Sequence, residues 1–252
     1  MRRVEASTSE LEAEVARLRA QLVEHERRAA AQTEQLGRYA ADLRETFKRE
    51  RESAQELRRS YVATVRALSN AVEARDAYTG RHAERVAAYG LAIAAATGIE
   101  LTDVPEIEFG FLLHDVGKVA IPDAILYKPE PLEPEEFSLM ARHTVIGWEI
   151  VRDVEFLGAA RDVVRSHHER WDGQGYPDGL AGEAIPLAAR VFAVADTLDA
   201  LTTERPYRQA GSIPDARAVI REQAGAQFDP RIVDAFDGIP DTDIEHIRAE
   251  IG

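Results

Sequence analysis

The sequence predicts a mostly helical protein, and two observations support this prediction. In the first seventy residues, apolar side chains recur at alternating intervals of four and three residues, the heptad pattern of a coiled-coil helix. Gly37 is the only glycine before Gly80, and the first proline is Pro105, so little in this stretch would interrupt a helix. Further along the chain, several histidines and aspartates lie in or beside apolar segments with helical periodicity.

The N-terminal seam carries polar side chains at His25 and Gln32, and charged residues fill its outer positions. A polar residue in such a seam weakens a two-stranded coil but can fix its register. We therefore expect residues 1–70 to be a signalling helix that forms a homodimer through a parallel coiled coil. The alternative is a solvated helix that folds back on its own domain. The apolar seam positions are Leu11, Val15, Leu18, Leu22, Ala29, Leu36, Tyr39 and Leu43.

The composition limits which residue types could bind a metal and indicates where in the cell the protein is found. The 252 residues are 45% hydrophobic and include no cysteine, so a metal site would have to use His, Asp and Glu. No apolar run approaches the roughly 18–20 residues that a membrane span needs. The N-terminus lacks the apolar core of a signal peptide. These features predict a cytoplasmic protein without a membrane span.

The negative charge is concentrated after the coiled-coil segment. Residues 1–70 contain 14 Lys and Arg against 12 Asp and Glu, whereas the remainder contains 17 against 33. Such an acidic domain would repel a nucleic-acid backbone, so we expect no nucleic-acid partner. A small anionic substrate would need metal ions or a few placed arginines beside it.

Five histidines and two aspartates form the strongest functional pattern. One buried histidine alone is most often a core residue whose polar atoms are satisfied locally. Five imidazoles and two carboxylates on apolar helical segments instead match a two-metal site in which one carboxylate bridges the ions. The residues are His82, His114, Asp115, His143, His167, His168 and Asp196.

The local sequence predicts where some of these ligands lie. His114 and Asp115 are expected in the last turn of a buried helix, with Gly117 as its terminator. His143 is expected on a helix that follows the capping-type run "LEPEEF".

Four motifs resemble the HD-GYP family, a branch of the HD-domain metal-dependent phosphohydrolases. They are "HDVGK" (114–118), "HHERWDGQGYP" (167–177), "GLAGEAIPLAARVFAVADTLDALT" (179–202) and "RPYR" (205–208). The resemblance covers roughly residues 71–236. It implies an all-α fold, an HD-type helical bundle over residues 71–237, followed by a C-terminal helical tail over 238–252. It also implies a phosphodiesterase that hydrolyses cyclic di-GMP with iron or manganese.

The resemblance assigns the ligands to two ions. One ion would be held by His82, His114, Asp115 and Asp196. Asp115 would bridge to the other, held by His143, His167 and His168. Relatives with a third metal carry a glutamate four residues before the first histidine. Tyr78 stands there in this chain, so two divalent ions, iron or manganese, are expected.

Three positions depart from the family pattern without removing a ligand. Relatives usually have proline after the histidine that corresponds to His143, and commonly have Asn and Gly where this chain has Tyr127 and Glu130. These departures concern the shape of the loops and the fit of the substrate.

The resemblance also suggests residues that act on the substrate. Lys118 would contact the scissile phosphate or assist the leaving oxygen, unless it is an ordinary surface lysine. Arg205 and Arg208 would grip phosphate groups through their guanidinium groups. Asp199, one helical turn after Asp196, could orient a ligand or cap a neighbouring helix.

The loop after His168 is expected to form a rigid, bent wall beside the second metal. Its motif residues are Gly173, Gly175, Tyr176 and Pro177, and the glycines permit turns with positive φ. Alternatively, aromatic residues of the loop such as Tyr176 simply pack it onto the core.

Three functions follow from these patterns. The first is a cyclic di-GMP phosphodiesterase that produces pGpG, GMP or both and is regulated through the coiled coil, with input from a signalling partner. The second is an HD phosphohydrolase that acts on another nucleotide. The third is a catalytically weak or inactive receptor for cyclic dinucleotides.

Overall fold

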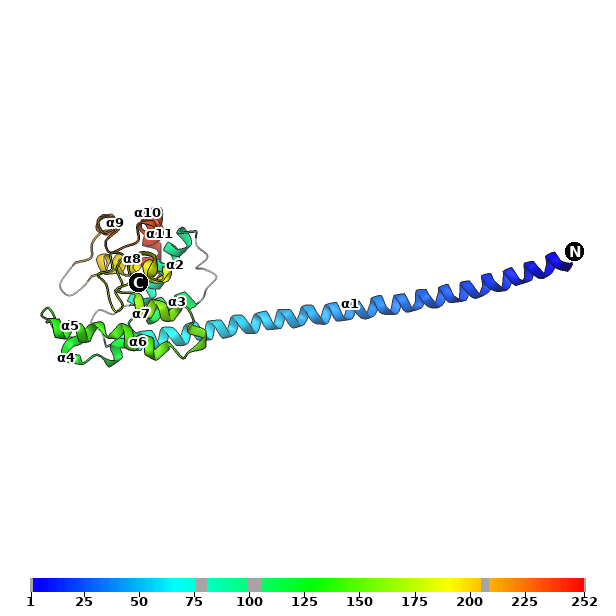
Figure 1. Cartoon of the computed structure of the whole chain (residues 1–252), viewed down its shortest axis with the longest axis horizontal. Helices are drawn as coiled ribbons and strands as arrows, with labels where there is room; N and C mark the ends of the chain where they lie inside the picture. The colour runs from blue at the N-terminus through cyan, green and yellow to red at the C-terminus, as the bar shows by residue number, and fades with distance from the viewer. Residues whose placement is uncertain (1, 76–80, 99–105, 205–208, 252) are drawn as a thin grey trace. The chain divides into compact units, whose positions relative to one another are not determined.

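The computed structural model describes residues 2–75, 81–98, 106–204 and 209–251. Their regular secondary structure is helical, which confirms the predicted all-α fold (Figure 1). Isolated β-bridges join Asp172 to Ala181 and Ala224 to Phe228. Within the described ranges, no helix has both the length and the apolar character needed to cross a membrane.

The chain divides into two units, Met1–Ser60 and Tyr61–Gly252. The sequence placed this boundary at residue 70. Helix α1 (Arg2–Glu73) supplies the whole helical part of the first unit, and its last turns belong to the second. In those last turns Val65 is 2% exposed, and the ring of Tyr61 stacks on Phe156 with centroids 4.5 Å apart.

The predicted long helix is therefore present as α1. Its seam side chains are open to solvent in the single chain, with Leu22 60% and Leu36 67% exposed. Glutamates and arginines one turn apart pair along its surface, including Glu24 with Arg28 at 2.9 Å.

Short helices build the second unit around one apolar core. Helix α8 packs against α2, α7 and α9, and α3 packs against α2 and α7. Phe111 and Phe192 meet in this core with ring centroids 5.6 Å apart. The elements are α2 (His82–Ala96), α3 (Glu106–Leu113), the 3-10 helix η2 (Val116–Ala120), α4 (Asp123–Leu126), α5 (Pro134–Ala141), α6 (His143–Val151), η3 (Glu155–Leu157), α7 (Ala160–Ser166), η4 (Gly182–Ala184), α8 (Leu187–Thr202), α9 (Ile213–Glu222), α10 (Pro230–Asp237) and α11 (Asp241–Ile251).

The expected role of Gly117 as a helix terminator is wrong. Helix α3 already ends at Leu113, and Gly117 lies inside η2. A Cβ at this position would overlap the carbonyl oxygen of His143 and lie 2.5 Å from the backbone nitrogen of Gly147. Glycine is thus needed because η2 and α6 approach each other closely at the backbone.

The capping-type run before His143 belongs to a separate short helix. Glu133 and Glu136 form a capping box at the start of α5, which ends at Ala141. His143 is the first residue of the following helix, α6. This break places the His143 ring beside the end of α7.

Candidate metal centre

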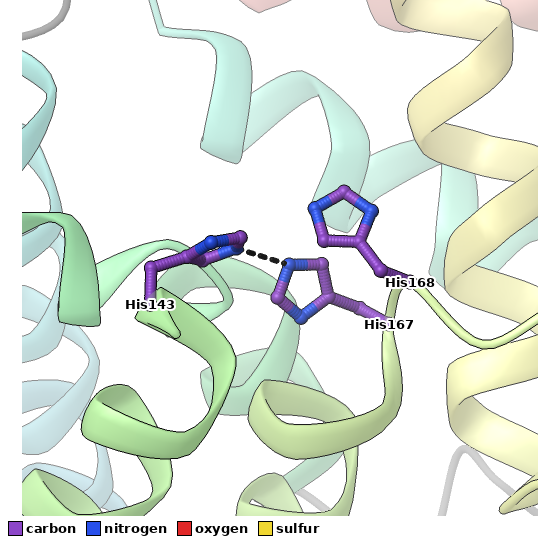
Figure 2. Close-up of side chains that lie close together, drawn as sticks. All are labelled: His143, His167 and His168. Carbon is purple, nitrogen blue, oxygen red and sulfur yellow. Dashed lines mark hydrogen bonds between the residues drawn. The ribbon is translucent and has the colours of Figure 1, made fainter. Parts of the chain in front are cut away.

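Three histidines from two helices form one cluster. His143 begins α6, and His167 and His168 follow the last residue of α7. Each offers a ring nitrogen that lies within 4.8 Å of those of the other two. Figure 2 shows the three rings gathered side by side. The Nε2 atoms of His143 and His167 are 3.2 Å apart.

The backbone fixes which nitrogen faces the cluster. The Nδ1 atoms of His114, His143 and His167 each lie 2.7–3.0 Å from the carbonyl oxygen three residues earlier. A carbonyl oxygen can only accept, so Nδ1 carries the proton and Nε2 of the neutral ring carries a lone pair. Two lone pairs then face each other between His143 and His167. This arrangement is unfavourable unless a cation lies between them, and it fits a bound metal ion.

Asp115 lies between two groups of histidines. Its Oδ2 is 3.1 Å from Nε2 of His114 and 2.7 Å from Nζ of Lys118. Its Oδ1 is 3.4 Å from Nε2 of His143 and 4.0 Å from Nε2 of His167. The two carboxylate oxygens therefore face different imidazoles, an arrangement suited to bridging two cations.

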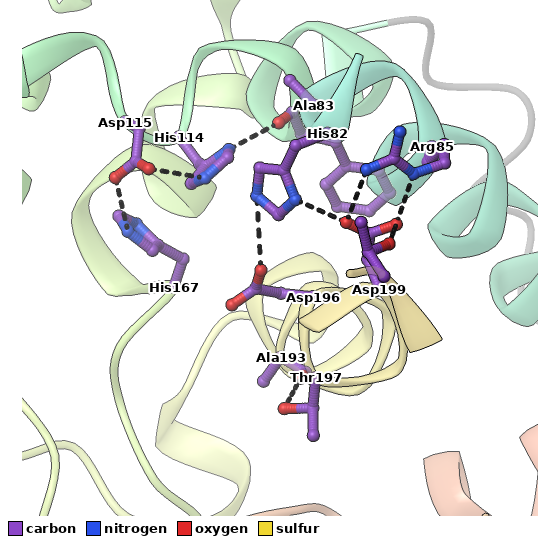
Figure 3. A network of polar contacts seen from close by, with 12 residues as sticks. His82, Ala83, Arg85, His114, Asp115, His167, Ala193, Asp196, Thr197 and Asp199 are labelled. Carbon is purple, nitrogen blue, oxygen red and sulfur yellow. Dashed lines mark hydrogen bonds and ion pairs between the residues drawn. The ribbon is translucent and has the colours of Figure 1, made fainter. Parts of the chain in front are cut away.

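The remaining predicted ligands meet between α2 and α8. Nε2 of His82 is 3.4 Å from Oδ1 of Asp196, and its Nδ1 is 2.7 Å from Oδ2 of Asp199 (Figure 3). Asp199 is 2% exposed and also accepts hydrogen bonds of 2.6 and 3.1 Å from the guanidinium of Arg85. Asp199 thus orients the His82 ring, and Arg85 in turn orients Asp199.

Arg85 was not predicted from the sequence. It is 5% exposed and neighbours the buried Val86 on α2. A charged residue inside the apolar face of an amphipathic helix is a signal that could have identified it, because a buried guanidinium needs a partner.

A cavity of about 280 Å³ opens over these groups. Its lining includes several of the predicted metal ligands, the side chain of Lys118, and carboxylates in and just after the last turns of α8. The lining residues are His82, Arg85, His114, Asp115, Lys118, Leu126, Met140, His168, Asp196, Asp199, Thr203 and Glu204.

Burial and neighbouring charges keep most of the cluster in its ligating form. Burial lowers the pKa of His143, His167 and His168, that of His168 to about 3. Burial acts to raise the pKa of Asp115, but the positive charge of Lys118 and the contact with His114 outweigh it and hold that pKa well below its usual range. Neutral imidazoles beside an ionised carboxylate are the forms that bind metal ions.

His82 is shifted in the opposite direction. Its burial acts to lower its pKa, but the hydrogen bond to Asp199 and the charge of Asp196 outweigh burial and raise it. A cation at Nε2 of His82 would therefore displace a proton.

Acidification is expected to destabilise the metal-free protein below pH 6.5, the ordinary pKa of histidine. The unfolded chain takes up protons there, whereas folded His168, with a pKa of about 3, stays neutral. Because the unfolded state then binds more protons, stability falls as the pH falls, progressively until about pH 3. His82 partly opposes this, since its raised pKa adds stability below pH 6.5 that is lost as the pH rises through its folded pKa.

Urea unfolding between pH 7 and pH 5, with a chelator present, tests this expectation. His168→Asn should make the dependence of stability on pH shallower. If the variant and the wild type showed the same pH dependence of stability, His168 would not be a source of that dependence.

The loop after His168 is held against the cluster. The ring of Tyr176 lies 4.7 Å from that of His168, at 30°. Gly173 has the expected positive φ of 78°. At Gly175, by contrast, a Cβ would lie 2.6 Å from the carbonyl oxygen of His168, so the loop packs directly on the ligand backbone.

Glu169 anchors this loop and was also missed by the sequence analysis. It is 4% exposed, and its carboxylate accepts hydrogen bonds of 2.8 and 3.0 Å from the backbone N–H groups of Asp178 and Leu180. No local pattern indicated these contacts, which span nine and eleven residues.

Three residues that the sequence analysis discussed as site positions lie outside the described ranges. They are Arg205 and Arg208, expected to bind the substrate, and Tyr78, at the position of the third-metal glutamate.

The described residues form a helical domain with a buried histidine cluster whose donor atoms could hold a metal ion. Residues 66–232 match the family model described as "HD domain", and the chain belongs to the HD domain family. Its expected membership of the HD-GYP branch is confirmed.

Three comparisons show what the chain is similar to. It is 42% identical over 201 residues to "Cyclic di-GMP phosphodiesterase response regulator RpfG" of Xanthomonas campestris pv. campestris, covering 79% of this chain and 50% of that protein. It is 39% identical over 181 residues to "3'3'-cGAMP-specific phosphodiesterase 2" of Vibrio cholerae, covering 71% of this chain and 35% of that protein. The chain therefore spans half or less of these relatives. A solved cyclic GMP-AMP-specific phosphodiesterase of V. cholerae shares the fold with a TM-score of 0.59 at 20% identity, over 75% of this chain and 50% of that one.

Proposed function

We propose that this protein is a metal-dependent phosphodiesterase that hydrolyses cyclic di-GMP to pGpG, GMP or both. The observation that carries the proposal is the convergence of lone pairs from His143 and His167 beside an ionised Asp115. Facing lone pairs beside a carboxylate repel one another, and a bound cation would relieve that repulsion. The names of the relatives supply the substrate class.

Two divalent ions fit the donor groups. His82, His114, Asp115 and Asp196 would hold one ion, while His143, His167 and His168, together with Asp115, would hold the other. The nitrogen and oxygen donors, without thiolate, suit iron or manganese. When bound, the ions would supply Lewis acidity toward the phosphoryl oxygens and a nucleophile at neutral pH.

Charge explains why the substrate needs these ions and a few basic side chains. Asp115, Asp196 and Glu204 line the cavity and would repel the phosphates of a cyclic dinucleotide. Lys118 also lines the cavity, and its ammonium group could contact the scissile phosphate or protonate the leaving oxygen. Beyond the described ranges, Arg205 would bind a phosphate, and Arg208 would do the same.

Anaerobically purified protein of measured metal content should hydrolyse cyclic di-GMP, and His114→Ala should not. Separation of the products over time identifies pGpG or GMP. Parallel assays with 3'3'-cGAMP test the second substrate class that the relatives suggest. Binding without turnover by the metal-loaded wild type would favour a receptor instead. If the protein neither bound nor hydrolysed cyclic di-GMP, assays with a panel of other nucleotides would test whether it is a phosphohydrolase with a different substrate.

Loss of the carboxylate behind His82 is expected to weaken metal binding. In Asp199→Asn the His82 ring loses its charged partner, so we expect metal affinity to fall by about 10-fold to 100-fold. Chelator competition measures this change. Asp162→Asn, an exposed substitution on α7, is the matched control. Equal affinities in the two variants would contradict the orienting role of Asp199.

We also propose that the protein is a homodimer joined through the seam of α1, whose apolar side chains are exposed in the single chain. Leu22→Glu would place charges in that seam and is expected to yield monomers by analytical ultracentrifugation. A dimer unaffected by Leu22→Glu would exclude the seam as the interface. Regulation by a signalling partner would act through the same helix.

A further inference from the structure

The end of α1 lies against the helix that carries His82, and one carboxylate makes the contact. Oε1 of Glu73 accepts a hydrogen bond of 2.6 Å from the backbone N–H of Ala83. Ala83 is the second residue of α2, so its N–H has no partner within the helix. Helices usually satisfy this group with the side chain just before them, but Arg81 makes no such bond. Glu73 thus caps α2 from another helix.

The start of α2 has little local support. Arg81 adopts φ 59° and ψ 30°, the left-handed region, and among the described residues it is the only non-glycine with positive φ. Such a conformation persists only where surrounding contacts impose it. One such contact is a hydrogen bond of 2.8 Å from Arg81 to the carbonyl oxygen of Ile251 in α11. The turn that presents His82 therefore depends on contacts from outside its own segment.

The same end of α1 reaches the other ligand segments. Oγ of Ser69 donates a hydrogen bond of 2.7 Å to the carbonyl oxygen of Leu112, two residues before His114. Nη1 of Arg75, just past the helix, donates one of 2.6 Å to the carbonyl oxygen of Val119. Backbone groups near His82, near His114 and in η2 are thus all bonded to residues 69–75.

We propose that Glu73 is a positioning residue for His82, through which the end of α1 sets the metal-binding geometry of the site. The inference rests on the proposed function, because it assigns an ion to His82. The His82 ring joins α2 to Asp196 and Asp199 on α8. A displaced first turn of α2 would carry Nε2 away from Asp196. His143, His167 and His168 should keep their geometry, because they lie at α6 and after α7 rather than on α2.

Three variants of the full chain test the role of Glu73. Glu73→Leu removes the acceptor, whereas Glu73→Gln keeps an oxygen that can accept from Ala83. Glu108→Leu is the matched control, because the Glu108 carboxylate also contacts the end of α1, through a 3.3 Å ion pair with Arg66. Titration with Mn²⁺ against a chelator should show affinity for one ion lowered by about 10-fold or more in Glu73→Leu alone. Glu73→Gln should restore most of it, and the affinity for the other ion should not change.

A second readout needs neither metal nor turnover. In metal-free protein with ¹⁵N-labelled histidine, the Nδ1–H signal of His82 reports its hydrogen bond to Asp199. Glu73→Leu should shift or broaden this signal and leave that of His143 unchanged. If Glu73→Leu and Glu108→Leu lowered the unfolding temperature equally, with unchanged His82 signals and metal affinities, Glu73 would be merely structural. If the wild type bound no metal, the proposed function would fail, while the His82 signal would still decide the positioning role.

Discussion

Asp115→Asn is expected to reduce hydrolysis of cyclic di-GMP by at least about 100-fold and to lower the metal content of the purified protein. Loss of groups that only orient ligands already costs about 10-fold to 100-fold. Asp115 contributes directly to both groups of imidazoles, through Oδ2 toward His114 and through Oδ1 toward His143. An amide offers a single neutral oxygen, so it cannot serve both.

Metal analysis and product formation measured on the same sample check this prediction. Asp162→Asn is the control for loss of one negative charge, and circular dichroism verifies the helical fold of both variants. An Asp115→Asn protein with two bound ions and more than a tenth of the wild-type rate would rule out the bridging role.

Gly117→Ala is expected to destabilise the second unit by about 3 kcal/mol or more, at the upper end of the range for overpacked cores. The added methyl group would meet backbone atoms of His143 and Gly147, which cannot rotate away as a side chain can. Since η2 follows Asp115 and α6 begins at His143, separating them would also pull two ligands apart. For a unit of this size the unfolding temperature should fall by about 6–12 °C.

Thermal unfolding followed by circular dichroism measures the effect. Gly37→Ala is the control, because Gly37 lies inside the helix α1 and a Cβ there would have no neighbour within 4 Å. Equal unfolding temperatures for the two variants would show that η2 and α6 can separate without cost.

Local patterns in the sequence were sufficient to predict the long N-terminal helix, the apolar helix that carries Asp196, and the ligand candidates. The heptad spacing in α1 and the apolar periodicity around Asp196 depend on neighbours within one or two turns. The structure places the seven ligand candidates around one site. The resemblance to a known family, rather than spacing, divided them between two ions and named Asp115 as the bridge.

Features that depend on close approach of distant segments could not be predicted in this way. Gly117 resembles a helix terminator, and only the nearness of α6 reveals its actual role. Arg85 could be noticed as a charged residue on the apolar face of α2, but its partner Asp199 lies 114 residues further along the chain. Glu73 looks like an ordinary charged residue until the backbone of Ala83, on another helix, is placed beside it. A single sequence contains no signal for such pairings.

The rings of His114, His143 and His167 are each oriented by a hydrogen bond from Nδ1 to the backbone carbonyl oxygen three residues earlier. Each of these contacts lies within a stretch of four residues. The empty protein would then already hold its donor atoms in place, so that taking up an ion requires no folding step. We therefore expect the fraction of sites that hold an ion to depend on the concentration of free ion, and not on whether the ion was present while the chain folded. Under the proposed function, the rate of hydrolysis would rise and fall with the concentration of the metal ion that the site binds.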